Sequence, residues 1–453
     1  METKMNSGAD DRGHLGERLP VSSPIQRLES HPLREELYEE VHERPSPMLR
    51  APMRASHMVF LTDEHSQEEA FDHVCRLARR YSANLPSAHS TCYYQDLGGF
   101  EIRWEKHTEF SSYTFLRRGI TDPPFSDNAL AVLPVDWLEA TPGLMIAAAH
   151  CVISDAPAPD PFGPELADWF EGQTLFGSRI VDDRARVFTT LRLHSDGFGR
   201  ILLFNKELSD YQTGRTLQRL LELETYRIMC LLGLPEARDI GPRAARLDRQ
   251  LAEIMDEFGG VSDGNEDQRL LNELTSLAAE VEHYRSATNY RFAATRAYDS
   301  LVGRRKDDLR EIKFSGMSSI GKFLERRLEP AIRTCQAVED QLESVSRRID
   351  RATDLLGARV DVGIESQNQQ LLGEMNRRGK LQLRMQQTVE GLSVAAISYY
   401  SVGLLKFGMN AMAAAGWPVN PDIGAGLSVP VVVVTVWWLI RKVRRRLTSD
   451  DAE

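Results

Sequence analysis

Residues 316–323, with the sequence GMSSIGKF, come close to the pattern of a phosphate-binding loop. Loops of the form GxxxxGK followed by Ser or Thr cradle phosphates with backbone N–H groups, and the final hydroxyl holds Mg²⁺. Here the final position is Phe323, and the surrounding pattern is helical instead of strand–loop–helix. We therefore interpret this run as a junction between helices built from small residues, and we predict no nucleotide cofactor.

Imidazoles and carboxylates gather near the N-terminus, where His31 and His42 share an acidic helix with Glu35, Glu36, Glu39, Glu40 and Glu43. Such groups can bind metal ions, but the spacing matches no ligand signature and favours a solvated helix face. His150 lies beside Cys151 on an apolar strand and is typical of a core histidine. No GxSxG or HExxH motif is present, so we predict no catalytic residue, no metal site and no enzyme activity.

The tripeptide Gly408, Met409, Asn410 lies at the end of the first of two apolar segments near the C-terminus. Backbone and Asn oxygens at such a place could meet a hydrated cation, because Mg²⁺ releases its water reluctantly. These three residues are our candidate pore mouth. The alternative is a simple helix end, with Met409 at the membrane interface and Asn410 as a cap. Lys406, just inside, would repel cations.

The two apolar segments predict membrane spans at about residues 391–411 and 423–440. Roughly 20 apolar residues in a helix cross the hydrocarbon core. Basic residues precede the first segment, and a second basic cluster of topology anchors follows the second: Arg441, Lys442, Arg444, Arg445 and Arg446. The positive-inside rule then predicts that both termini lie in the cytoplasm. The lipid bilayer is therefore a predicted partner of the two spans. The alternative is a buried helical hairpin of a soluble protein.

The rest of the chain has the composition of a soluble protein. Of 453 residues, 27% are charged, and the net charge of −11 argues against nucleic-acid binding. Residues 1–28 are polar and rich in Gly, Ser and Pro, so we expect a disordered leader and no signal peptide. The five cysteines lack CxxC spacing and fit reduced thiols in a cytosolic body.

Residues 29–240 predict a cytosolic α/β domain. We expect a helix at 29–47, a strand at 56–62, a helix at 66–82 and a three-strand meander within 91–118. A further strand at 143–154, a hairpin around residues 195–199 and a long helix at 209–233 follow. Ser209 is the predicted N-cap of that helix, and Gly233 with Pro235 is expected to end it.

Residues 241–390 predict a helical stalk without strands, in which Pro330 is either a break or a first-turn proline. Its apolar seam steps by three and four residues, as in a coiled coil, through Leu342, Val345, Ile349, Ala352 and Leu356. The stalk runs directly into the first span. We expect the seam to support a homo-oligomer, and its pairing within or between chains stays open. The predicted fold class is thus an α+β domain, a helical stalk, a transmembrane hairpin at 391–440 and a basic cytosolic tail at 441–453.

The order of these parts resembles that of CorA-type magnesium transporters. Those proteins have a cytosolic α/β domain, long stalk helices, a first span ending in Gly-Met-Asn, a short outer loop, a second span and a basic tail. The resemblance implies a homo-oligomeric channel for Mg²⁺ with the tripeptide at the pore mouth. In this chain the segment after the tripeptide, AMAAAGWPVNPD, departs from the family in having only one acidic residue, Asp422.

A closer resemblance covers nearly the whole chain. The segments HPLREELYEEVHERP, TGRTLQRLLELETYRIMCLLGLP, FLERRLEPAIRTC and TVEGLSVAAISYY are similar to an uncharacterised family of bacterial membrane-anchored proteins, a domain of unknown function. This resemblance implies a bacterial inner-membrane protein and supplies no activity. We therefore expect a membrane-anchored scaffold or sensor whose cytosolic domain binds a protein partner. The alternatives are a CorA-like cation transporter and a tethered enzyme whose site is assembled from distant residues.

Overall fold

The computed structural model describes residues 31–34, 38, 46–88, 90–259, 264–416, 418 and 420–450. The predicted leader at 1–28, most of the predicted helix at 29–47 and the last three residues lie outside the described residues. The chain divides into two compact units. The first comprises Met1–Arg249 with Ala279–Ser346, and the second comprises Gln250–Ala278 with Arg347–Glu453. Both units contain parts of the same three long helices.

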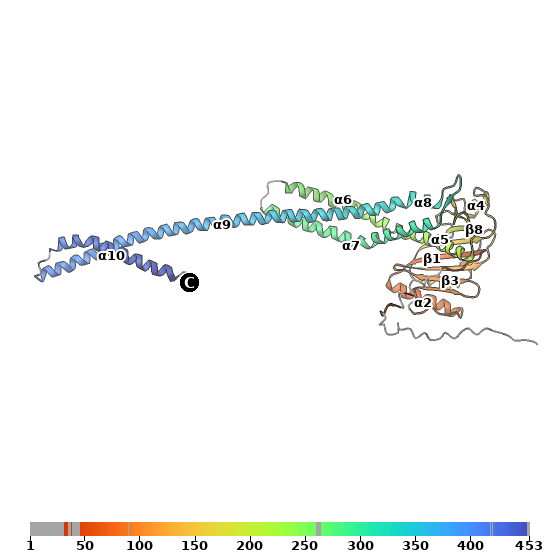
Figure 1. Cartoon of the computed structure of the whole chain (residues 1–453), viewed down its shortest axis with the longest axis horizontal. Helices are drawn as coiled ribbons and strands as arrows, with labels where there is room; N and C mark the ends of the chain where they lie inside the picture. The colour runs from red at the N-terminus through yellow and green to blue at the C-terminus, as the bar shows by residue number, and fades with distance from the viewer. Residues whose placement is uncertain are drawn as a thin grey trace, which may run out of the picture. The chain divides into compact units, whose positions relative to one another are not determined.

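One mixed sheet organises the first unit (Figure 1), and its strand order is β2-β3-β4-β1-β5-β8-β7-β6-β9. The strands are β1 (Met53–Leu61), β2 (Cys92–Asp96), β3 (Glu101–Lys106), β4 (Phe110–Arg118), β5 (Leu144–Ser154), β6 (Phe176–Ile180), β7 (Ala185–Thr189), β8 (Gly199–Asn205) and β9 (Ile312–Lys313). Neighbouring strands are antiparallel except β5 and β8, which are parallel. The predicted α+β class is confirmed for this domain.

Most strands and the first described long helix follow the sequence prediction. The strand at 56–62, the meander, the strand at 143–154 and the hairpin correspond to β1, β2 to β4, β5, and β7 with β8. Helix α2 (Glu64–Arg80) begins at Asp63, whose side chain accepts from the backbone of Ser66. Strand β6 was not predicted. Strand β9 departs from the prediction of helix alone after residue 241, because two residues between helices pair with the exposed edge of β6.

Apolar layers lie on both faces of the sheet. Helix α2 packs Ala70, Val74 and Leu77 onto Ile102 and Trp104 of β3. On the opposite face lies α5 (Asp210–Leu231), which forms a capping box between Ser209 and Gln212, so the predicted N-cap is confirmed. Short helices α3 (Val135–Glu139) and α4 (Pro164–Trp169) and a 3-10 turn, η2 (Ala129–Val132), fill the connections.

The next helices after α5 are α6 (Gly233–Phe258), α7 (Gly264–Asp308), α8 (Ile320–Arg327) and α9 (Glu329–Ala414). Helix α5 ends at Leu231, close to the end predicted at Gly233. Gly233 and Pro235 were predicted to end this helix, but they lie in the first turn of α6, where proline is tolerated. Pro330 likewise lies in the first turn of α9. Helix α9 is continuous to Ala414, so the predicted continuity of stalk and first apolar segment is confirmed.

The seam predicted for oligomerisation is buried inside a single chain. In the first unit, Leu342 of α9 packs against Ile240 of α6 and Phe292 of α7. In the second unit, Ile349, Ala352 and Leu356 are no more than 3% exposed within this one chain. The seam therefore gives no argument for association between chains, which corrects the reason for expecting a homo-oligomer. Three-helix packing already satisfies its apolar residues.

The second unit also holds α10 (Pro421–Asp450), which follows α9 after a short connection. Two helical regions in the described residues, Ile320–Ala414 and Pro421–Lys442, contain stretches long and apolar enough to cross a membrane. Only 6% of each apolar window is buried in the protein. A core hairpin of a soluble protein would be mostly buried, so the alternative of a buried hairpin gains no support.

Candidate functional site

The predicted pore-mouth residues lie inside α9, one turn before its end. Helix α9 continues past Asn410 to Ala414, so Asn410 does not cap the helix. The Asn410 side chain is exposed, whereas Met409 is half-buried. A Cβ placed on Gly424 would lie 2.5 Å from the Met409 sulfur, so the thioether packs on the small residue of α10. Met409 thus joins two helices of one chain, and Gly408 has open space around it.

The lysine beside the tripeptide is paired. Lys406 of α9 forms an ion pair with Asp422 at the start of α10, with 2.8 Å between Nζ and the carboxylate oxygen. Asp422 is the acidic residue of the connecting segment, so the pair neutralises the one lysine of the first apolar segment. The two helices are therefore held together at their connected ends by one ion pair and one Met–Gly contact.

The topology anchors extend α10. The Arg441 guanidinium lies 4.9 Å from the centre of the Trp437 ring, and the Lys442 ammonium lies 4.9 Å from that of Trp438. A cation over an indole suits the boundary between apolar and aqueous phases. The backbone at Arg444, Arg445 and Arg446 is helical, and their side chains lie outside the described residues. The predicted tail at 441–453 therefore begins as a continuation of the helix to Asp450.

The loop that resembles a phosphate site is filled by a carboxylate. Helix α8 begins after Ser319, and its first two N–H groups, of Ile320 and Gly321, each donate to Glu311 at 2.9 Å. The Glu311 carboxylate thus occupies the place where a phosphate would meet a helix N-terminus. A Cβ on Gly321 would lie 2.7 Å from that carboxylate. The run connects strand β9 to helix α8, so it is not the predicted junction between two helices.

The histidines singled out from the sequence lie apart. His150 is 4% exposed, bonds Ser56 Oγ through Nδ1 at 2.8 Å and stacks on Phe198. Burial lowers its pKa to about 4, so it is neutral at pH 7, as expected of a core histidine. The Nδ1 atom of His31 accepts from Leu33, while His42 and the five glutamates lie outside the described residues. Among described residues, no three potential ligands gather to hold a metal.

The structure brings Ser195, His194 and Glu171 together, an arrangement the sequence did not reveal. Glu171 accepts from Ser195 Oγ at 2.6 Å and lies 3.4 Å from His194 Nδ1. In a Ser–His–acid triad the histidine bridges the other two groups, whereas here the carboxylate does. Its hydrogen bonds from Ser195, followed by the nearby Arg200, lower the Glu171 pKa to about 2. So weak a base does not activate a hydroxyl.

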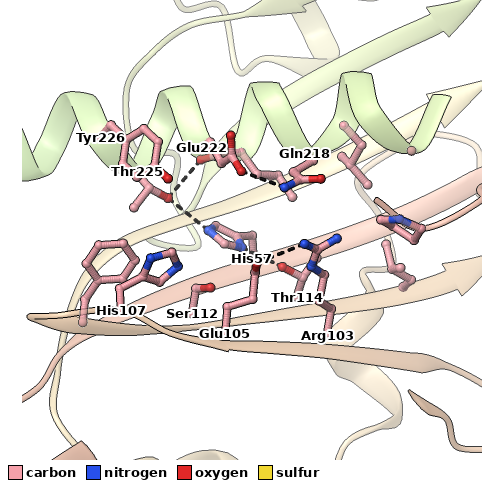
Figure 2. A pocket seen from close by; sticks show the side chains of 16 residues that line it. His57, Arg103, Glu105, His107, Ser112, Thr114, Gln218, Glu222, Thr225 and Tyr226 are labelled. Atoms are coloured by element: carbon pink, nitrogen blue, oxygen red, sulfur yellow. Dashed lines mark hydrogen bonds and ion pairs between the residues drawn. The ribbon is translucent and has the colours of Figure 1, made fainter. Parts of the chain in front are cut away.

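A cavity lies between the polar face of the sheet and α5 (Figure 2). Strands β1, β3 and β4 contribute polar side chains to it, and so does α5: His57, Arg103, Glu105, His107, Ser112, Thr114, Gln218, Glu222 and Thr225. The polar side chains of β3 alternate with Ile102 and Trp104, which face α2. Because successive side chains of a strand point to opposite faces of the sheet, the apolar residues of β3 face α2 and its charged residues face α5.

His57 is locked in the wall of this cavity. Its Nδ1 atom lies 2.8 Å from Thr114 Oγ1, and its Nε2 atom lies 3.1 Å from Thr225 Oγ1. Thr225 donates its own proton to the Leu221 carbonyl at 2.9 Å, so it accepts from Nε2–H, and Thr114 donates to Nδ1. Burial lowers the His57 pKa to about 4. The imidazole is therefore a neutral connector between strand and helix.

Two ion pairs flank the cavity. Arg103 and Glu105 lie 2.9 Å apart, with 5% and 12% of their side chains exposed. Burial opposes the Arg103 charge, but the Glu105 carboxylate outweighs it and raises the Arg103 pKa. Glu222 of α5 pairs with Arg305 of α7 and accepts from Gln218. Pairing of this kind makes a buried charge tolerable and ties its partners to each other.

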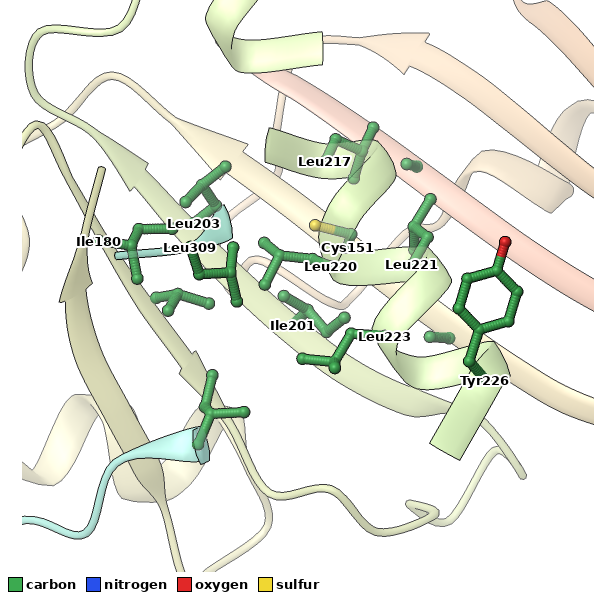
Figure 3. Close-up of a cluster of buried hydrophobic side chains, with 14 of the residues drawn as sticks. Cys151, Ile180, Ile201, Leu203, Leu217, Leu220, Leu221, Leu223, Tyr226 and Leu309 are labelled. Atoms are coloured by element: carbon green, nitrogen blue, oxygen red, sulfur yellow. The ribbon is translucent and has the colours of Figure 1, made fainter. Parts of the chain in front are cut away.

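Apolar packing beneath the cavity fixes α5 on the sheet (Figure 3). Leu217, Leu220 and Leu223 of α5 form a buried cluster with Cys151 and Ile201 of the sheet. The segment before β1, which contains Pro47, approaches α5 at Gly214. A Cβ at Gly214 would lie 1.7 Å from the Pro47 carbonyl oxygen, so only glycine permits this crossing.

The free space in the cavity is about 40 Å³. A water molecule needs roughly 10–15 Å³ of such space, so the cavity holds a few waters, well below the roughly 300 Å³ of a typical ligand pocket. His57 links the sheet to α5 through Thr114 and Thr225, while Arg103 pairs with Glu105 and Glu222 pairs with Arg305. The alternation of Arg103, Glu105 and His107 in the predicted meander was the sequence signal of this polar layer, but the helix that covers it comes a hundred residues later.

A comparison with protein families decides the affiliation of the chain. The model of a family described as a protein of unknown function matches residues 29–447. The chain belongs to the DUF3422 family. This finding confirms the resemblance seen in the sequence, and DUF3422 supplies no activity with its description. No curated protein matches the chain. The resemblance to magnesium transporters finds no support in these comparisons.

Proposed function

We propose that this DUF3422 protein is anchored in a membrane by α9 and α10 and presents its sheet domain as a scaffold or sensor on one side. The observation that carries the proposal is the pair of long apolar windows, each only 6% buried by the protein. An exposed apolar surface of that extent is stable when lipid covers it. For orientation, the positive-inside rule places both termini and the sheet domain in the cytoplasm of a bacterial cell.

Three further contacts support this proposal. The pair Lys406–Asp422 leaves no uncompensated lysine in the first apolar segment. Arg441 and Lys442 lie on the tryptophans at the opposite end of α10, where an aromatic and basic boundary is expected. The cavity under α5 has room for only a few waters, and several of its polar groups pair with one another, which favours a structural head over an enzyme. A protein partner of the head is part of the proposal.

Site-directed labelling in whole cells tests the topology. In a Cys92→Ser background, Asn420→Cys should react with an impermeant maleimide from outside. Ser449→Cys should react only after lysis. Cys92 is replaced because it is the half-buried native thiol, while the other four are buried. Labelling of both positions from outside, or of Ser449→Cys alone, would overturn the orientation, and extraction of the protein by alkaline carbonate would overturn the anchoring.

A further inference from the structure

A long stretch of α9 has no covering partner in its own chain. Leu356 is buried at 1% exposure, but every residue from 361 to 389 is exposed. At 1.5 Å per residue this stretch is about 43 Å long. It separates the packed three-helix part from the first apolar window and carries charges that keep it out of the hydrocarbon core. An isolated helix of this kind gains little stability in water.

Five of the nine large apolar side chains exposed on this stretch recur with a heptad spacing. Ile364, Leu371 and Met385 fall on one repeating position, d, and Met375 and Val389 fall on the other, a. These five side chains are 52–71% exposed. The same spacing places the polar residues Asp361, Asn368 and Gln382 at a positions and Arg378 at a d position. Apolar residues at a and d are the pattern of a two-stranded seam, and polar residues at a positions favour one register at a cost in stability.

We propose that this stripe is the contact surface for a second copy of the same chain, in a parallel and in-register coiled coil. The inference rests on the proposed anchoring. Copies that share one membrane have the same orientation and present the stripe at the same height. The seam of α9 that is buried internally ends at Leu356, and the intermolecular seam begins about two turns later, at Ile364. Under this proposal, a second copy of the chain is one partner of the proposed scaffold.

The charge pattern fits this partner. Arg377, Lys380 and Arg384 fall on outer heptad positions, away from the seam. Glu374, at a flanking g position, faces Gly379 at the e position of a parallel partner, so no like charges meet there. Arg378 lies at a d position and would meet Arg378 of the second copy across an in-register seam, but Glu374, four residues earlier, lies at the spacing at which opposite charges attract along a helix.

Two exposed leucines of the stretch provide a matched test. Leu371, 59% exposed, lies in the stripe, while Leu383, 52% exposed, lies at an outer position. Native mass spectrometry of the full-length protein in detergent should show a dimer for the wild type and for Leu383→Glu. Leu371→Glu should shift it to monomer, with a dissociation constant roughly a hundredfold higher or more, because the seam would bury two unpaired carboxylates. Equal behaviour of both variants would overturn the proposal.

Cross-linking in membranes gives a second readout that does not depend on detergent. In the Cys92→Ser background, Met375→Cys should form an intermolecular disulfide on mild oxidation, since facing core positions bring Cα atoms within about 7 Å. Asn376→Cys, an outer position, should not. Equal or absent cross-linking at both positions in protein shown to be embedded would overturn the dimer alone. Cross-linking of Met375→Cys in protein that carbonate extracts would support the dimer and overturn the anchoring.

Discussion

The crossing of the N-terminal segment over α5 makes a quantitative prediction for Gly214→Ala. The new Cβ would lie 1.7 Å from the Pro47 carbonyl oxygen, where ordinary contacts begin near 3.4 Å, so segment and helix must separate by about 1.7 Å. Separation breaks the hydrogen bond from Leu49 N to the Asp210 carbonyl, now 3.0 Å, and disturbs Leu49, which is fully buried.

The magnitude follows from three opposing contributions. A lost backbone hydrogen bond costs about 1 kcal/mol, and partial exposure of a buried leucine costs about 2 kcal/mol. Alanine favours the helix over glycine by up to about 1 kcal/mol. We expect Gly214→Ala to lower the free energy of unfolding by about 2 kcal/mol. Urea unfolding of the full-length protein in detergent, followed by fluorescence of the buried Trp104, measures the change.

A glycine with open space provides the control. A Cβ on Gly303 of α7 would meet no atom within 4 Å. Gly303→Ala should therefore stabilise the protein by up to about 1 kcal/mol through helix propensity alone. If Gly214→Ala proved as stable as Gly303→Ala, the crossing would not be a tight contact. The segment that borders the cavity would then be loosely held, and the reasoning from Gly214 would fail.

Three other outcomes are expected. The folded state holds the His57 pKa near 4, below its unfolded value of about 6.5, so its stabilisation is complete above pH 6.5 and lost as pH falls toward 4. Between pH 6.5 and 4 the wild type should lose on the order of 3 kcal/mol of unfolding free energy through this group, and His57→Gln should lack this loss. An unchanged pH dependence of urea unfolding in the variant would contradict this. Asp422→Lys should lower the thermal stability of the detergent-solubilised protein, and the added Lys406→Asp should restore it, because the swap rebuilds the pair at 2.8 Å; no restoration would mean that the pair contributes nothing. Vesicles reconstituted with the wild type should take up Mg²⁺ no faster than protein-free vesicles, whereas faster uptake that Asn410→Ala abolishes would support a pore instead.

Local signals predicted most of the sheet domain. Alternating residues gave β2 to β4, apolar runs gave β1 and β5, and the Ser209 cap gave the start of α5, because each depends on neighbours in sequence. Strand β9 escaped prediction since two residues carry no periodicity, and only the open edge of β6 makes Ile312 and Lys313 a strand. Pairing with a distant edge is a tertiary property.

The candidate sites show the same division. The apolar windows and basic clusters could be read directly from residue order, but the partners of their charged residues could not. Lys406 meets Asp422 only because two helices fold back on each other. Glu311 reaches the start of α8 through a loop that the glycine pattern does not describe. The seam at Leu342 gave the right helix but left its partner open, since period alone does not say which helix covers an apolar stripe.

The participation of late residues in the sheet domain sets an order for its synthesis. The core beneath α5 includes Leu309, Ile320, Leu324 and Ile332, and β9 completes the sheet edge. A ribosome that has made only the first 240 residues therefore carries an unfinished domain with an open strand edge and an uncovered apolar layer. The domain can close only when α8 and the start of α9 emerge, which happens before the first apolar window is made. The head can thus fold before the first apolar window has been synthesised, and a soluble fragment needs residues up to the end of the first unit, at Ser346.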